Sequence, residues 1–237
     1  MVNLRSRVTR LGVLDIGSNT IHMLIVDAAP GARPDPEAST KSTVRLMQYV
    51  KDDGSIKKSG IEAILTAVDQ CMELAEEYDI TQLLAMATSA IKEAPNSNKI
   101  LRKIEERIGQ SVTVLSGTDE ARLTFLAARR WYGWDAGRLL MLDIGGSSLE
   151  VAMGSDEEPT VALSAAAGAC RITREYLPEG TASVDELEVV RKKVRRILEP
   201  MVDEFPKSKH PAHAVGTSKT FRSLARLAGA VLRQSGR

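Results

Sequence analysis

The sequence predicts an α/β protein built from two copies of one layered unit. Strand patterns and helix patterns alternate along the chain after each of two hairpin-like stretches, which is typical of sheets covered by helices. One seven-residue phrase occurs twice, because Leu14–Thr20 (LDIGSNT) is echoed by Leu142–Ser148 (LDIGGSS), and 143 − 15 gives a spacing of 128 residues. The length of 237 residues is enough for one large domain or two of ordinary size. Together these observations predict an internal duplication.

The first unit is expected over residues 1–135. Apolar runs flank the first LDIG phrase and predict a hairpin, and the three-proline stretch 30–40 predicts a surface loop. The apolar positions of 58–78 recur with a helical period, and Gly109 is typical of a helix C-cap. In order, the expected elements are strands 11–16, 21–27 and 43–50, helix 58–78, strand 82–87, helix 98–108, strand 112–115 and helix 118–131, with Gly117 or Thr118 as the N-cap of the last helix.

The second unit is expected over residues 136–237, after a linking stretch at 131–138 that contains Gly133, Asp135 and Gly137. It repeats the opening hairpin around the second LDIG phrase. Its expected elements are a hairpin at 139–153, a strand at 160–164, helices at 169–176 and 183–202, a strand at 212–215 and a helix from 217 to about 232. This unit is shorter than the first, so its fold is expected to be incomplete at the C-terminus.

Composition sets the class of protein. Hydrophobic residues make up 43% and charged residues 27% of the chain, which is ordinary for a water-soluble globular protein. The formal net charge is +1, so a polyanion would have to be bound by a local basic patch. Two cysteines far apart in sequence favour reduced thiols and a cytoplasmic location. No run is apolar enough to span a membrane, and no signal-peptide core precedes the first strand.

The two LDIG phrases are typical of phosphate-binding turns. Glycine lets backbone N–H groups approach an anion closely, and the neighbouring hydroxyls add donors. A carboxylate at the mouth of the turn offers oxygen to a divalent cation. We therefore expect two facing turns to hold a phosphate chain and its metal. The residues expected to bind phosphate through these turns are Ser18, Asn19, Gly145, Gly146, Ser147 and Ser148.

Five further segments carry a resemblance to a known family. These segments are Ala87–Lys92 (ATSAIK) followed by Asn96, Ser116–Ala121 (SGTDEA), Asp143–Glu150 (DIGGSSLE), Gly168–Arg171 (GACR) and Gly216–Ser218 (GTS), after the opening Asp15–Thr20 (DIGSNT). In this order they resemble the exopolyphosphatase/guanosine pentaphosphate phosphohydrolase family, and most of all its short two-domain actinobacterial exopolyphosphatases. The resemblance implies the duplicated actin-like ATPase/sugar-kinase (ribonuclease H-like) fold.

The resemblance also implies a reaction and the residues that perform it. It assigns activation of the attacking water to Glu120, in the first turn of a helix after a Ser-Gly turn, where the helix dipole alone would also favour a carboxylate. Glu150 is expected to orient the water or bind the metal, because it shares a strand face with Ser148. Mg²⁺ (or Mn²⁺) is expected on Asp143, with Asp15 or Glu150. Lys92 and Arg171 are expected to contact phosphate.

Three departures from the family pattern stand out. Ser147 replaces the usual third glycine, Lys92 stands where arginine is common, and Lys219 follows the GTS turn in place of glycine. Family members also continue beyond position 237. The run 191–196 (RKKVRR) resembles a polyphosphate track, but the acidic first turn of the same predicted helix favours a solvated charge pattern.

Several functions remain open at this point. Aromatic residues make up only 4% of the chain, which favours inorganic polyphosphate over guanosine pentaphosphate, because a guanine base needs a specific cradle. A non-catalytic phosphate or nucleotide sensor and a kinase-like ATPase are the alternatives. The sequence gives no sign of a nucleic-acid or membrane partner, and a homodimer is compatible with it.

Overall fold

The chain divides between Leu115 and Ser116 into two units, and each has its own sheet and core. The computed structural model describes residues 8–29, 35–178, 180–205 and 210–230. The mixed sheets and the repeated hairpins confirm the duplicated α/β fold.

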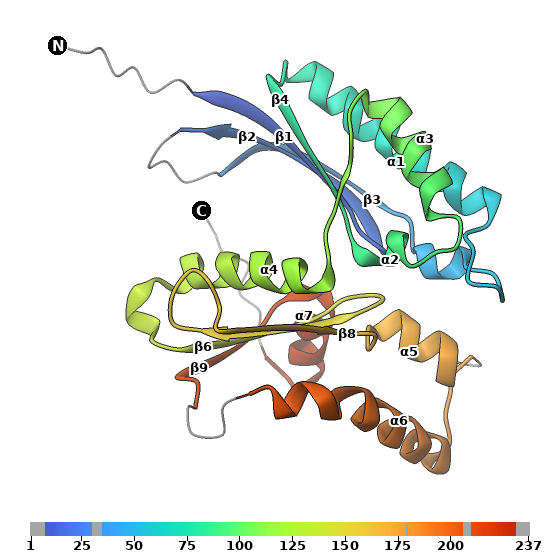
Figure 1. Ribbon diagram of the computed structural model, residues 1–237, viewed down its shortest axis with the longest axis vertical. Coiled ribbons are helices and arrows are strands. Elements are labelled where there is room, and N and C mark those ends of the chain that lie inside the picture. The colour runs from blue at the N-terminus through green and yellow to red at the C-terminus, as the bar shows by residue number, and fades with distance from the viewer. Residues whose placement is uncertain (1–7, 30–34, 179, 206–209, 231–237) are drawn as a thin grey trace. The chain divides into compact units, whose positions relative to one another are not determined.

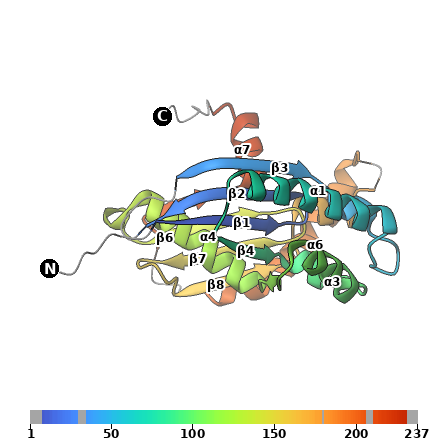
Figure 2. The same ribbon diagram turned by 90° about the horizontal axis from the view of Figure 1, so that it is seen from above.

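The first unit holds a five-stranded sheet in the order β3-β2-β1-β4-β5, of which Figure 2 labels the first four strands. Strands β1, β2 and β3 form an antiparallel meander, and β4 and β5 continue the sheet in parallel. The helices α1 and α3 cover one face of this sheet (Figure 1). The elements are β1 (Thr9–Ile16), β2 (Thr20–Ala28), β3 (Pro36–Thr43), η1 (Leu46–Tyr49), α1 (Lys58–Glu77), β4 (Gln82–Ala87), α2 (Ser89–Lys92), α3 (Ser97–Ile108) and β5 (Thr113–Val114).

The core of the first unit joins alternate strand residues to the inner faces of the helices. Leu14 and Ile16 of β1 are fully buried, as are Val68 and Cys71 of α1. Burial raises the pKa of the Cys71 thiol to about 11, so this cysteine stays protonated at neutral pH. Both cysteines are free, and Cys170 is exposed, which agrees with the reduced thiols expected from the sequence.

The third strand is the main error of the sequence prediction in this unit. A strand was expected over 43–50 and a loop over 30–40, whereas β3 covers Pro36–Thr43. As an edge strand bonded only to β2, it is polar and lacks the apolar alternation of a buried strand. The following segment bends away because the carbonyl of Asn19 accepts from Val44 and Arg45, and the segment continues as η1. Residues 30–34 lie outside the described part.

The second unit repeats the same plan with the sheet order β8-β7-β6-β9. Its meander is antiparallel, and β9 joins β6 in parallel, as β4 joins β1. Figure 1 shows α4 on one face of this sheet and α6 and α7 on the other. The elements are α4 (Gly117–Tyr132), η2 (Trp134–Ala136), β6 (Leu139–Ile144), β7 (Leu149–Gly154), β8 (Val161–Ala165), α5 (Ala169–Tyr176), α6 (Val184–Asp203), β9 (His213–Gly216) and α7 (Ser218–Leu227).

Helix α4 belongs to the second unit, although the sequence placed the boundary after it at residue 135. The helix packs on β6, β7 and β8 through the buried Ala121, Phe125 and Ala128. Its N-cap is Ser116 rather than Gly117 or Thr118, because the Ser116 hydroxyl and the Asp119 carboxylate form a reciprocal capping box. Helix α7 ends at Leu227, and the expected end near residue 232 lies outside the described residues.

A search of the described helices found none with the length and apolar character needed to cross a bilayer.

Candidate active site

The two repeated turns have the same backbone geometry. In the first unit the Gly17 N–H donates to the Thr20 carbonyl at 3.0 Å, and in the second the Gly145 N–H donates to the Ser148 carbonyl at 2.9 Å. Both turns connect the first two strands of a meander, and both follow an aspartate at the end of the first strand. The sequence prediction of two matched hairpin turns is therefore confirmed.

The turn of the second unit is held from one side by the start of α5. The N–H groups of Ala169 and Arg171 donate to the carbonyls of Gly145 and Gly146, both at 3.0 Å. The Ser147 carbonyl accepts from the Gly168 N–H at 3.1 Å and from Arg171 Nε at 2.8 Å. All three carbonyls thus point toward α5. This leaves the N–H groups of 146–148 without a backbone carbonyl partner among the described residues, as an anion-binding turn requires.

Two carboxylates face each other across the hairpin beside this turn. Asp143 and Glu150 are partners in the register of β6 and β7. Strand alternation places them on the same face as Met141 and Ala152, which pack under α4. Glu150 is only 4% exposed, and its Oε1 accepts a hydrogen bond from the Ser164 hydroxyl at 3.0 Å. The site therefore holds a buried acid between two strands.

Asp143 is fixed by a contact from a distant part of the chain. The Thr217 hydroxyl donates to Asp143 Oδ2 at 2.5 Å, and the Thr217 N–H donates to the Leu142 carbonyl at 2.9 Å. Thr217 lies between β9 and α7, so the GTS turn joins the site through the parallel pairing of β9 with β6. Burial raises the pKa of Asp143, and the Thr217 hydrogen bond opposes that shift.

Glu120 reaches the same group from the first turn of α4. The helix starts close to β8, since a Cβ added to Gly117 would lie 2.4 Å from the Ser164 hydroxyl oxygen. The Glu120 charge is felt by Glu150, whose pKa it raises. Burial is the larger cause, and together they raise the Glu150 pKa to about 7, against the hydrogen bonds from Ser148 and Ser164. One unit therefore brings together three acids and a phosphate-type turn.

The raised pKa of Glu150 makes the metal-free protein less stable above pH 7 than at pH 4.5. The folded state binds this proton more tightly than the unfolded state, so stability is lost as the pH rises from about 4.5 to about 7. We expect Glu150→Gln to raise the free energy of unfolding by about 2–4 kcal/mol at pH 8 and to have little effect at pH 4. Urea unfolding in EDTA at the two pH values measures this difference.

The control for that measurement is Glu157→Gln. Glu157 is exposed and its pKa is lowered by the hydrogen bond from Arg130, so its effect has the opposite sign. An equal change for Glu150→Gln at both pH values would show that its carboxyl is not the source of the instability.

The remaining predicted residues lie in the first unit. The β1–β2 turn contains Ser18 and Asn19. Asp15 precedes this turn near the end of β1, and its side chain is exposed. Lys92 is the last residue of α2 and is also exposed. It follows β4, and the Thr88 N–H donates to the Ile16 carbonyl at 3.2 Å, so Lys92 lies at the same edge of this sheet as the turn. Their roles in phosphate or metal binding stay predictions.

The carboxylates of the second unit fit a magnesium ion that takes only some of its ligands from the protein and the others from a phosphate substrate and water. The described residues contain no group of three or more side chains arranged as a complete metal site. Mg²⁺ commonly uses only one or two carboxylates and takes its other ligands from phosphates and water. Asp143 and Glu150 are two such carboxylates, and a cation would relieve the cost of their buried charge.

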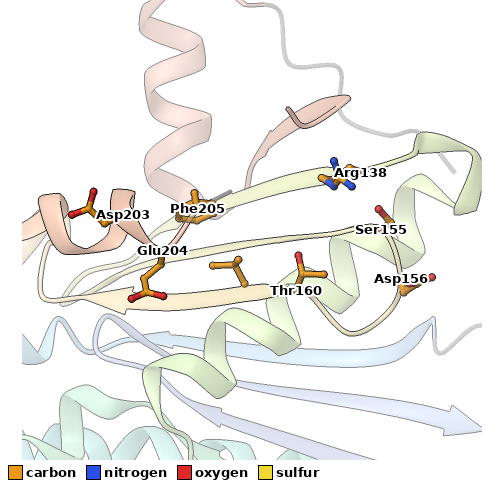
Figure 3. A pocket seen from close by; sticks show the side chains of 8 residues that line it. Arg138, Ser155, Asp156, Thr160, Asp203, Glu204 and Phe205 are labelled. Carbon is orange, nitrogen blue, oxygen red and sulfur yellow. The ribbon is translucent and has the colours of Figure 1, made fainter. Parts of the chain in front are cut away.

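A separate cavity of about 460 Å³ lies at the other end of the second sheet (Figure 3). Arg138 precedes β6 and Ser155 follows β7, so this cavity is remote from the strand ends that carry Asp143 and Glu150. None of the predicted site residues lines it. Its mixture of one arginine with Asp156, Asp203 and Glu204 does not suit a polyanion.

Three contributors to the site were not assigned a role from the sequence. Ser164 has no local signal, because its contact with Glu150 depends on how β8 pairs with β7. Gly168 and Thr217 lie in the GACR and GTS segments, so the motif marked them without showing what they contact. The structure shows that Gly168 packs against the turn and that Thr217 bonds to Asp143.

Comparison with known proteins agrees with this geometry. Residues 24–236 match the Ppx/GppA phosphatase family. The chain is 47% identical over 228 residues to Exopolyphosphatase 1 of Mycobacterium tuberculosis, which covers 96% of this chain and 66% of that protein. It is 45% identical over 227 residues to Exopolyphosphatase 1 of Mycobacterium leprae, covering 96% and 67%. The chain thus spans about two thirds of the length of these relatives.

Solved structures show the same fold. An exopolyphosphatase from Cytophaga hutchinsonii matches with a TM-score of 0.83 and 25% identity, over 92% of this chain and 70% of that one. A Ppx/GppA enzyme from Aquifex aeolicus matches with a TM-score of 0.75 and 23% identity, over 94% of this chain and 72% of that one.

Proposed function

This chain belongs to the Ppx/GppA phosphatase family, and from that premise we propose that it hydrolyses the terminal phosphoanhydride bond of inorganic polyphosphate. The observation that carries the proposal is the grouping of Glu120, Asp143 and Glu150 beside a turn whose N–H groups have no backbone carbonyl partner in the part of the chain that the structure describes. The names of the mycobacterial relatives support polyphosphate as the substrate.

The reaction adds water across one phosphoanhydride bond and releases one phosphate. In our proposal Glu120 accepts a proton from the attacking water, whose oxygen forms the new bond to the terminal phosphorus. The bond from that phosphorus to the bridging oxygen breaks, and the shortened chain leaves with its electron pair. A positioned general base of this kind contributes about 10²–10⁴ in rate. Glu150, with its raised pKa, orients the water through its hydrogen-bonding oxygens.

The turn would stabilise the charge of the transferred group, together with a cation held by the nearby carboxylates. Donors that are fixed before the reaction stabilise developing negative charge at little reorganisation cost. The N–H groups and hydroxyls of 146–148 would supply them, with Ser18, Asn19, Lys92 and Arg171 as further predicted phosphate contacts. Asp143 and Glu150, with Asp15 as a further candidate, would hold Mg²⁺, which supplies charge neutralisation of the phosphoryl oxygens when bound.

The test is phosphate release from polyphosphate with Mg²⁺ by the wild type and by Glu120→Gln. We expect the substitution to lower the turnover number by at least about a hundredfold and to leave polyphosphate binding intact, because only the base is lost. Glu157→Gln, an exposed carboxylate in the same unit, should retain full activity. Faster release of phosphate from guanosine pentaphosphate than from polyphosphate would favour that substrate, and binding without turnover by the wild type would favour a sensor.

A further inference from the structure

The first unit carries a cavity with a strongly basic rim, which plays no part in the site described above. Its volume is about 360 Å³. Four lysines and one glutamate line it, together with the Asn96 amide and an apolar floor that includes Ile56. The charged residues are Lys51, Lys58, Lys99, Lys103 and Glu62. Four positive charges against one negative charge make this a concentrated basic cluster in a chain whose net charge is only +1.

The lysines come from three separate segments that one side chain holds together. The Asn96 amide accepts from the Ile56 N–H at 3.0 Å and donates to the Ile56 carbonyl at 2.9 Å. This pair of bonds ties the chain before α1 to the start of α3. The first residue of α1, Lys58, is thereby brought to the same cavity as Lys99 in the first turn of α3.

The positive charge of the rim is only partly compensated. Lys58 lies 3.6 Å from Glu62 and Lys51 interacts with the Asp53 carboxylate, whereas Lys99 and Lys103 form no salt bridge within the described part of the chain. Neither α1 nor α3 has an acidic residue in its first turn, so the positive ends of two helix dipoles add to the lysine charge. Lys99 and Lys103 are four residues apart on one helix, where like charges repel. The arrangement costs stability and suits the binding of an anion.

The cavity lies at the same edge of the first sheet as the repeated turn. The segment that leads to Lys51 begins on that turn, because the Leu46 N–H donates to the Ser18 carbonyl at 2.7 Å. Helices α1 and α3 both start at the edge where β1 and β4 end, as Figure 1 shows. The turn and the lysine cavity are therefore two potential anion contacts at one edge of the first sheet.

We propose that this lysine cavity binds a distal segment of a long inorganic polyphosphate chain, a role that rests on the proposed function. A linear phosphate chain needs repeated cations and offers no base to recognise. The cavity matches this requirement, since its lining combines lysines with aliphatic side chains and includes no aromatic residue. Single-stranded nucleic acid, in contrast, is usually bound with aromatic platforms for stacking.

The test compares long-chain polyphosphate with tripolyphosphate as substrates. The variant Lys99→Gln/Lys103→Gln removes two charges from the cavity and touches no residue of the candidate active site. We expect its KM for the long chain to rise about tenfold, while kcat and the KM for tripolyphosphate stay unchanged, because a distal site adds affinity only for a chain that extends beyond the segment being hydrolysed. The charge-retaining variant Lys99→Arg/Lys103→Arg should restore the long-chain KM.

Lys192→Gln/Lys193→Gln is the matched control, because it removes the same charge from an exposed part of α6 in the second unit. We expect this control to behave as the wild type. An equal rise in KM for both substrates, an unchanged long-chain KM, or the same effect in the α6 control would overturn the proposal. Displacement of labelled polyphosphate by a single-stranded RNA at equal phosphate concentration would also overturn it, in favour of a nucleic-acid site.

A failure of the proposed function would give a different pattern. The wild type would then hydrolyse neither substrate, and equilibrium binding of fluorescently labelled long-chain polyphosphate would decide about the cavity alone. About tenfold weaker binding by the Lys99→Gln/Lys103→Gln variant than by the wild type would support the lysine cavity, and equal binding would refute it.

Discussion

Replacing Arg129 by methionine is expected to lower the free energy of unfolding of the second unit by about 3–5 kcal/mol. Arg129 is 1% exposed and lies at the end of α4. Its Nη1 donates to the carbonyls of Gly137 at 2.5 Å and Ser155 at 3.0 Å, and its Nη2 donates to the Gly133 carbonyl. One guanidinium therefore joins the end of a helix, the start of β6 and the turn after β7. Methionine would remove the donor that these three part-buried carbonyls share and would break the link between the three segments.

Its neighbour in sequence provides the control. Arg130 is exposed and pairs with Glu157 at 2.8 Å, so Arg130→Met should change stability by less than about 1 kcal/mol. Urea unfolding followed by circular dichroism measures both variants. Similar losses of stability for the two substitutions would show that the three carbonyl contacts of Arg129 contribute little. The loss would then come only from removing a positive charge near the C-terminal end of α4.

Replacing Gly168 by alanine is expected to reduce phosphate release by at least about a hundredfold, because the turn would be displaced from its productive position. A Cβ at this position would lie 2.3 Å from the carbonyl carbon of Ser147 and 2.4 Å from the nitrogen atoms of Ser147 and Ser148. These are backbone atoms and have no alternative rotamer. The backbone of Gly168 has φ −70° and ψ 151°, which any residue adopts, so the requirement for glycine is one of space.

The matched variant is Gly109→Ala, because Gly109 is required for its backbone conformation and not for lack of space. Gly109 has φ +71° and no atom within 4 Å of an added Cβ, so alanine there costs about 1 kcal/mol through backbone conformation and contacts nothing. We expect Gly109→Ala to keep full activity and Gly168→Ala to lose it, with a stability loss of about 1–3 kcal/mol from overpacking. Full activity of Gly168→Ala would mean that the turn is not held by α5 during the reaction.

Much of the fold could be predicted from apolar periodicity and the repeated phrase. Helix α1 and strand β4 occupy the residues expected of them, give or take one position, because each has a buried face with a clear period. Strand β3 could not be found in this way, since its pairing with β2 stabilises a polar edge. The sequence also could not show that α4 belongs to the second unit, because this depends on the sheet against which Phe125 packs.

The acids of the candidate site could be predicted, but their partners could not. Glu120, Asp143 and Glu150 stand in motifs, whereas the bond from Thr217 to Asp143 joins positions 74 residues apart. Burial and the nearby charge of Glu120 on α4 raise the pKa of Glu150 to about 7, against the hydrogen bond from Ser164, and only the folded unit brings these groups together. Local patterns thus identify the reactive groups, and long-range packing sets their acidity.

The 128-residue repeat has a consequence for symmetry. In the first hairpin Asp15 is paired across the strands with His22, and in the second Asp143 is paired with Glu150 at the equivalent position. Two identical subunits related by a twofold axis would have to carry the same residue at both places. Fusion of the copies into one polypeptide removes that constraint. Each hairpin was thereby free to diverge, one toward an acid–imidazole pair and the other toward a pair of acids.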